Sequence, residues 1–140
     1  MSLLDTADPK HAHAEGRLRT EPIVWLTTVG PDGRPQSTPV WFLWDGESFL
    51  LYSRPGRPKL RNVAANAHVS LHLEGDGVGG DNVVFEGTAV LVPDAPPADS
   101  VASYIEKYRA RIDSYGWTPA SFAADYVVAI RIRPERVRVW

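Results

Sequence analysis

Short runs of hydrophobic residues, separated by turn-forming residues, recur along most of the chain, and this pattern predicts β-strands. The runs are rich in β-branched and aromatic side chains and are bounded by glycine, proline and aspartate. Short turns join the first three strands, which predicts a meander of three neighbours. We expect Pro134 to separate the last two strands and Gly87 to mark a β-bulge or bend. The predicted strands cover residues 23–29, 37–44, 48–52, 68–73, 83–92, 127–132 and 136–140.

Helical spacing appears in the gaps between these strands. A helix is predicted from Pro58, because proline suits the first helical position and apolar residues then recur three and four apart. These apolar residues are Leu60, Val63, Ala64 and Ala67. The same spacing over residues 101–112 predicts an amphipathic helix, and Thr118-Pro119 begins a shorter one. Residues 74–82 contain four glycines and predict a mobile loop, either a lid or a plain linker.

The number of strands and the length of the chain together predict the fold class. A chain of 140 residues has the size of one domain. Six or seven short strands would leave exposed edges unless their sheet closes, so we expect a mainly β fold, a small β-barrel with flanking helices. Residues 21–140 are expected to form this single domain. Residues 1–20 are predicted to be a short helix, which Asp8-Pro9 would cap, or a disordered arm.

Four large aromatic residues accompany the first predicted strands: Trp25, Trp41, Phe42 and Trp44. Their combined size exceeds what the interior of one small barrel needs. We expect the core to take most of them and the remainder to meet a second subunit or a flat ligand.

Composition and charge narrow the classes of function. The formal net charge is −2, so the chain lacks the overall basic charge that would point to nucleic acid. Cysteine is absent, which excludes a disulfide framework, a thiolate metal site and a cysteine nucleophile. No hydrophobic run resembles a signal peptide or reaches the length of a membrane span. We therefore expect a soluble cytoplasmic protein that binds neither nucleic acid nor membrane.

No residue is predicted to act as a metal ligand, general acid, general base or nucleophile. His68 and His72 would suit a metal on a helix, but on a strand four residues span about 13 Å, too far for one ion. Tyr104 and Tyr108 fall on the apolar face of their predicted helix and are expected in the core. A binding site without catalytic side chains is typical of proteins in which a cofactor carries the chemistry.

Residues 53–62 form the strongest candidate for a binding site. They lead from a strand through a tight turn at Gly56 into the helix predicted at Pro58. Four cations crowd this helix start, and no acidic residue lies between Glu47 and Glu74 to neutralise them. Because a helix N-terminus attracts anions, we predict a phosphate site, with a solvated basic turn as the alternative. The cations are Arg54, Arg57, Lys59 and Arg61, and Asn62 is expected to share a helix face with Lys59.

Five motifs follow one another along the chain. They are Trp25-Leu26-Thr27-Thr28-Val29, Asp32-Gly33-Arg34-Pro35, Thr38-Pro39-Val40-Trp41-Phe42, Gly56-Arg57-Pro58-Lys59-Leu60-Arg61-Asn62 and His68-Val69-Ser70-Leu71. Together they resemble the split β-barrel flavin-binding proteins related to pyridoxamine 5'-phosphate oxidase. The similarity is closest to the actinobacterial branch that uses the deazaflavin coenzyme F420, and residues 107–109, 116–119 and 136–140 extend it. Each motif alone has little specificity, whereas the ordered set is specific.

The resemblance implies an assembly and a set of site residues. In such proteins two subunits form the cofactor sites at their interface, so a homodimer is expected. A basic turn holds the cofactor phosphate, which assigns this contact to Arg57, Lys59 and Asn62, with Ser53 and Arg54 nearby. The strand with Pro39, Val40, Trp41 and Phe42 would support the ring system. The chain ends in Arg-Val-Arg-Val-Trp and lacks the Arg-Leu-x-Pro type signature of true pyridoxamine-phosphate oxidases, which argues against that activity.

The resemblance also implies a reaction, namely hydride transfer between reduced F420 and a small organic acceptor. FMN has the same tricyclic ring and a phosphate, so an FMN-dependent oxidoreductase of the same fold is the alternative. F420 continues into a lactyl-oligoglutamate tail, which could use the surplus cations Arg54, Arg57 and Arg61. A protein that carries or shields the cofactor without turnover is a further alternative, because its sequence would look the same.

Overall fold

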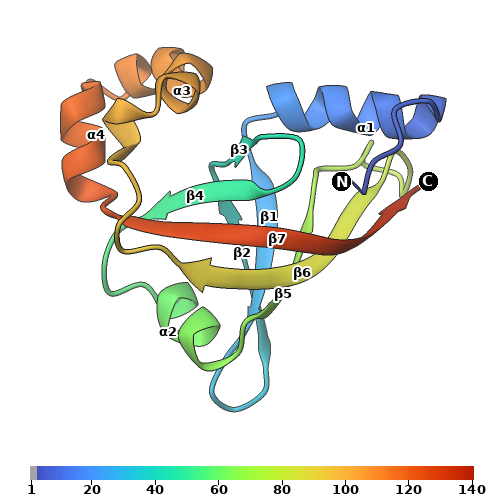
Figure 1. Ribbon diagram of the computed structural model, residues 1–140, viewed down its shortest axis with the longest axis horizontal. Helices are drawn as coiled ribbons and strands as arrows, with labels where there is room; N and C mark the ends of the chain where they lie inside the picture. Colours follow the sequence, from blue (N-terminus) through green and yellow to red (C-terminus); the bar gives the residue numbers. More distant parts are fainter. Residues whose placement is uncertain (1–2) are drawn as a thin grey trace.

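A curled, seven-stranded antiparallel sheet forms the centre of the computed structural model, which describes residues 3–140 (Figure 1). The strands are β1 Val24–Val29, β2 Pro35–Val40, β3 Leu43–Trp44, β4 Phe49–Ser53, β5 His68–His72, β6 Val83–Leu91 and β7 Val128–Val139. The helices are α1 Pro9–Thr20, α2 Pro58–Ala65, α3 Ala102–Ser114 and α4 Pro119–Asp125, with a short 3-10 turn, η1, at Ala98–Ser100. The strand order is β2-β1-β5-β6-β7-β4-β3. The predicted mainly β fold with flanking helices is confirmed.

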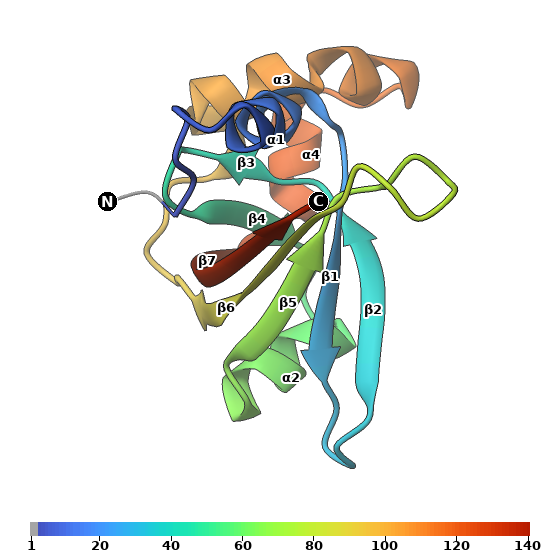
Figure 2. The ribbon, with the colours of Figure 1, turned by 90° about the vertical axis from the view of Figure 1, so that its right-hand side faces the viewer.

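The two edge strands, β2 and β3, are joined by only two residues, Trp41 and Phe42. Since β2 and β3 stand at opposite ends of the strand order, this link requires the sheet to curl until its edges approach each other. Figure 2 shows the result, with β1 and β2 running steeply across the direction of β4 and β7. The predicted meander is therefore wrong. The hairpins β1–β2 and β3–β4 both form, but the apolar run at residues 40–44 is divided between the two edges.

Inward-facing side chains of the sheet form the main core. Val69, Leu71 and Leu73 are buried, as the alternating pattern predicts. Phe42 and Trp44 also lie in this core. Helix α1 covers one end of the sheet and inserts Ala14 and Leu18 (Figure 1). Asp8 caps α1, because its Oδ1 accepts a hydrogen bond from the backbone N–H of Lys10 at 2.9 Å.

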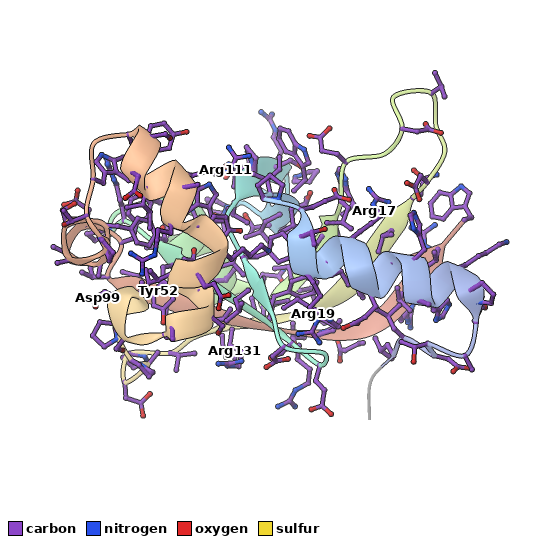
Figure 3. All side chains as sticks on the ribbon, turned by 90° about the horizontal axis from the view of Figure 1, so that it is seen from above. Arg17, Arg19, Tyr52, Asp99, Arg111 and Arg131 are labelled. Carbon is purple, nitrogen blue, oxygen red and sulfur yellow. The ribbon has the colours of Figure 1, made fainter. Side chains whose placement is uncertain are left out.

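A second hydrophobic cluster lies on the outer face of β4 and β7. Leu50, Tyr52 and Ala129 of these strands pack there against α3 and α4. Helix α3 contributes the residues that its spacing predicts, Tyr104, Ile105, Tyr108 and Ile112. Figure 3 views the molecule from above and shows Tyr52 at the side of α3. This packing fixes the two helices next to the end of β4, where their side chains form one wall of a cavity.

Strand β7 continues through Pro134, so the predicted break is wrong. Pro134 pairs with Gly87 where the β6–β7 register shifts between Glu86 and Gly87, and a bulge tolerates a residue without an N–H donor. The β-bulge predicted at Gly87 is confirmed. Glycine suits this position because a Cβ on residue 87 would lie 2.3 Å from the carbonyl oxygen of Arg133.

The glycine-rich loop at residues 74–82 is held by α1. Arg17 donates to the carbonyl oxygens of Glu74 and Asp81, at 2.7 Å for Asp81, and also pairs with the carboxylates of Glu21 and Asp81. Figure 3 shows Arg17 between α1 and this loop. His13 on the preceding turn of α1 lies 3.1 Å from an Asp81 oxygen.

Candidate functional site

A cavity of about 300 Å³ opens between the end of β4, the start of α2 and the helices α3 and α4. Its volume lies at the lower end of the range for small-molecule sites. Segments from four parts of the chain meet around it: residues 39–41, 52–59, 104 and 115–126. The lining residues are Pro39, Val40, Trp41, Tyr52, Ser53, Arg54, Arg57, Lys59, Tyr104, Tyr115, Trp117, Phe122 and Tyr126.

Aromatic side chains form one wall of the cavity. Trp41 leaves the end of β2 and stacks on Tyr108, with ring centroids 4.4 Å apart and planes within 2°. Phe122 lies 5.4 Å from Trp41 and 4.7 Å from Tyr126, both in stacked geometry. Trp117 completes this wall from the link between α3 and α4. Such a stacked set presents flat apolar faces, which suit a planar ring system.

Cations form the opposite end, at the start of α2. Gly56 takes φ +76°, which glycine adopts without strain, and Pro58 occupies the first helical turn. The N-cap residue Arg57 makes no side-chain capping bond. Within residues 3–140, neither Arg57 nor Lys59 has a carboxylate partner. The sequence thus folds into a helix start whose two cations are free to meet an anion, at the positive end of the helix dipole.

The pKa of Lys59 reflects this setting. Burial lowers the pKa of Lys59, and the neighbouring Arg57 guanidinium lowers it further. An anion placed here would oppose both effects, because it stabilises the charged ammonium group. The start of α2 therefore holds two cations that no carboxylate within residues 3–140 compensates.

Three predicted site residues do not border the cavity. Arg61 is exposed on α2, and Phe42 lies in the barrel core. Asn62 is turned inward rather than sharing the face of Lys59, and its Nδ2 donates to Thr28 Oγ1 at 3.0 Å and to Gln36 Oε1 at 2.8 Å. In this structure Asn62 therefore attaches α2 to β1 and β2, and its contact with a phosphate stays a prediction. Helix α2 ends at Ala65, so Ala67 is not part of it.

The family model described as pyridoxamine 5'-phosphate oxidase matches residues 10–140. The chain belongs to the pyridoxamine 5'-phosphate oxidase family. The match covers all seven strands described above and both ends of the cavity. The split β-barrel expected from the sequence motifs is thereby confirmed as the fold.

Solved structures agree with this family assignment. A structure named F420 reductase is 29% identical, covers 89% of this chain and 94% of its own, and has a TM-score of 0.66. A candidate pyridoxamine 5'-phosphate oxidase from Listeria innocua is 25% identical, with 94% and 98% coverage and a TM-score of 0.68. A conserved hypothetical protein from Mycobacterium tuberculosis is 27% identical, with 92% and 82% coverage and a TM-score of 0.73. This member of the oxidase family is therefore similar both to a structure named as an F420 reductase and to one named as a pyridoxamine 5'-phosphate oxidase.

Several lining residues of this family member were not predicted from its sequence. They are Tyr52, Tyr104, Tyr115, Trp117, Phe122 and Tyr126. All are aromatic, and four of them cluster within residues 115–126, where a surplus of rings in a short segment was the available signal. That signal is ambiguous, because aromatic residues in a helical pattern usually indicate core.

Two residues of α3 fix the segment that carries Trp41. The hydroxyl of Tyr108 accepts a hydrogen bond from the N–H of Phe42 at 2.8 Å and donates to the carbonyl oxygen of Pro22 at 2.8 Å. The Nζ of Lys107 donates to the carbonyl oxygen of Phe42 at 2.9 Å and lies 3.6 Å from the centroid of its ring. Helix α3 therefore holds both the N–H and the carbonyl oxygen of Phe42 in the link between β2 and β3, and this keeps Trp41 in the aromatic wall.

Neither a metal site nor a membrane-spanning helix is found in the part of the chain that the structure describes. Among residues 3–140, no three His, Cys, Asp or Glu side chains gather in a way that could hold a metal ion. In the same residues, no helix combines the length and hydrophobicity needed to cross a bilayer.

Proposed function

We propose that this protein binds coenzyme F420 in the cavity at the start of α2 and uses it in an oxidoreductase reaction with a small organic acceptor. The observation that carries the proposal is the pairing of a stacked aromatic wall with an uncompensated basic helix start in one cavity. A ring system and a phosphate on one molecule would match the two ends. The similarity to a structure named F420 reductase supports this choice.

The donor set fits a phosphorylated ring cofactor. Arg57 and Lys59 at the start of α2 would hold the phosphate, since neither has a carboxylate partner in residues 3–140. Trp41, Phe122 and Tyr126 would hold the ring and exclude water from it. When bound, reduced F420 supplies a hydride, and solvent can supply the proton that the acceptor needs.

A shallow hollow beside the cavity favours F420 over FMN. Arg54 and Arg57 border both the cavity and this hollow, which continues along Pro55 to the end of α4 at Asp125 and Val127. An oligoglutamate tail that leaves the phosphate could lie here against the two arginines, whereas FMN ends at its phosphate. Asp125 works against such a tail, so we expect the gain in affinity to be modest. Arg61 borders neither space and could reach a tail only from solvent.

The proposal also includes a homodimer, as the sequence motifs imply, and a cytoplasmic location, as expected from the lack of a signal-like or membrane-length hydrophobic run in the sequence. A second subunit would enlarge a cavity that, in one chain, is at the lower end of the size range for such ligands. An FMN-dependent enzyme and a non-catalytic carrier would use the same residues, so the test must separate all three.

The cofactor is tested by titrating the purified protein with F420, with a version of F420 trimmed back to the phosphate, and with FMN. Ring absorbance and fluorescence report binding at low and moderate salt. We expect long-tailed F420 to bind tightest and to lose most affinity as salt rises, because its tail meets exposed cations. Tighter binding of FMN than of long-tailed F420, or no effect of trimming, would overturn the choice of F420.

Variants test the phosphate site in the same titrations. Arg57→Ala and Lys59→Ala should each weaken both F420 and FMN, by about 1.5–3 kcal/mol for a lost charged hydrogen bond. Arg57→Ala should weaken long-tailed F420 somewhat more than FMN, because Arg57 also borders the hollow proposed for the tail. Lys10→Ala removes an exposed cation from α1 and serves as the control. Steady oxidation of reduced F420 with an added acceptor identifies an enzyme, and binding without turnover identifies a carrier.

A further inference from the structure

Two buried polar atoms in the cavity wall lack hydrogen-bond partners. Tyr104 is 0% exposed, and its hydroxyl bonds to no group in residues 3–140. The Nε of Arg54 is also buried and has no hydrogen-bond partner in residues 3–140, although the guanidinium lies over the ring of Tyr126, 5.1 Å from the centroid. Both residues line the same cavity, the one at the start of α2. Buried polar groups are normally satisfied, so this pair calls for an explanation.

The other buried tyrosines on this face show the normal case. The hydroxyl of Tyr108, one turn further along α3, bonds to Phe42 and Pro22. The hydroxyl of Tyr52 donates to the carbonyl oxygen of Pro96 at 2.7 Å. Tyr104 packs against the rings of both, at 5.1 Å and 5.2 Å, with Phe122 at 6.0 Å. Phenylalanine would make these ring contacts equally well, so the fold gives no reason for a hydroxyl at this position.

The chemistry of the two unpartnered atoms defines what they could bind. Arginine Nε–H is a donor only, and a buried tyrosine hydroxyl donates readily. Burial raises the pKa of Tyr104 well above its ordinary value, so its proton is retained. Two donors that border one cavity suit a ligand edge with oxygen or nitrogen acceptors. The carbonyl-bearing edge of a flavin or deazaflavin ring is such an edge, whereas the phosphate would lie with Arg57 and Lys59.

We propose that the Tyr104 hydroxyl is a specificity-determining donor to an acceptor atom on the ring of the bound cofactor, with Arg54 Nε as a second donor nearby. This inference rests on the proposed function and adds to it, because it explains how the aromatic end of the cavity distinguishes a ring with carbonyl groups from any other flat apolar molecule. Tyr104 binds in this account and does not transfer a proton.

The test compares wild type with Tyr104→Phe, which removes one oxygen and keeps the ring. Probes are F420, FMN and riboflavin, which carry a ring, and inorganic phosphate, which carries none and is measured by its competition with FMN. We expect Tyr104→Phe to bind every ring-bearing probe about 3- to 10-fold more weakly and to bind phosphate as wild type does. Its melting temperature should be unchanged or higher, since the lost hydroxyl has no protein partner.

Tyr108→Phe is the matched structural variant. It should lower the melting temperature, because the N–H of Phe42 and the carbonyl of Pro22 lose their partner. Equal affinity of wild type and Tyr104→Phe for the ring-bearing probes would overturn the inference while leaving the proposed function intact. Equal weakening of phosphate, or a melting temperature that falls as in Tyr108→Phe, would show a structural role and also overturn it. If wild type binds none of the ring-bearing probes, the proposed function fails and this inference fails with it.

Discussion

Lys107 holds its ammonium group where positive charge is disfavoured. Burial lowers the pKa of Lys107 to about 8, although the nearby Glu21 carboxylate acts in the opposite direction. The group still donates to the carbonyl oxygen of Phe42 and lies over the ring of that residue. The hydrogen bond from Lys107 therefore stabilises the link between the two edge strands, while the burial of its positive charge destabilises the folded state.

This cost predicts how stability changes with pH. Between about pH 8 and pH 10 the unfolded chain keeps the proton on Lys107 and the native chain releases it, so the free energy of unfolding should rise with pH. Above about pH 10 stability should fall, because burial raises the pKa values of Tyr104 and Tyr108 and the native chain keeps protons that the unfolded chain loses. Urea unfolding at several pH values measures both effects.

Lys107→Met is the variant that isolates the first effect. It should flatten the rise between about pH 8 and pH 10 and leave the fall above it, whereas a smaller rise from Lys59 should remain. Partial exposure of Lys107 keeps its slope below the full value of about 1.4 kcal/mol per pH unit. A variant whose stability follows that of wild type at every pH would contradict the assignment.

At the scale of residues, the sequence predicts which side chains can bind an anion better than it predicts the way each side chain points. Arg57 and Lys59 could be assigned to one site because they are close in sequence and share a helix start. Asn62 is equally close, yet its side chain faces the barrel, since the rotation of a short helix about its axis is set by packing. Tyr104 lies on α3 and Tyr126 follows the end of α4, both far in sequence from residues 53–62, and only tertiary structure brings them to the cavity.

At the scale of elements, β6 and β7 are shaped by one small residue. Gly87 has no Cβ, and this lets the backbone of Arg133 and Pro134 approach it closely. Turn signals and alternation predicted most strand positions. Besides the break expected at Pro134, the exception is at residues 40–44, because an apolar run carries no mark of where a chain leaves one strand and enters another on the opposite edge.

Two glycine variants test this account of the bulge. Gly87→Ala should destabilise the fold by about 2–4 kcal/mol, because its Cβ would overlap the carbonyl oxygen of Arg133. Gly16→Ala, in the middle of α1, meets nothing within 4 Å and should stabilise by about 0.5–1 kcal/mol. Both changes are measured by urea unfolding. A Gly87→Ala protein as stable as wild type would show that the close approach is easily relieved.

At the scale of the whole molecule, we predict a homodimer. Of the large aromatic residues near the first strands, Phe42 and Trp44 lie in the core. Trp25 lies on the outer face of the sheet, where its ring stacks with that of His72, the two centroids 6.4 Å apart. An isologous interface over a barrel flank would cover such a surface. Light scattering at micromolar concentration should give the mass of two chains. A monomer that still binds its cofactor tightly would refute this.

The position of β7 has a consequence for how the chain is made. Its twelve residues pair with β6 on one side and β4 on the other, so β7 alone joins β4 and β3 to the other strands by backbone pairing. On a ribosome that adds about 5–20 residues per second, the apolar strand β4 waits about 4–17 seconds before residues 128–139 can cover its edge. Chaperones that recognise exposed hydrophobic strands are therefore expected to engage β4 during synthesis and to release it once β7 has left the exit tunnel.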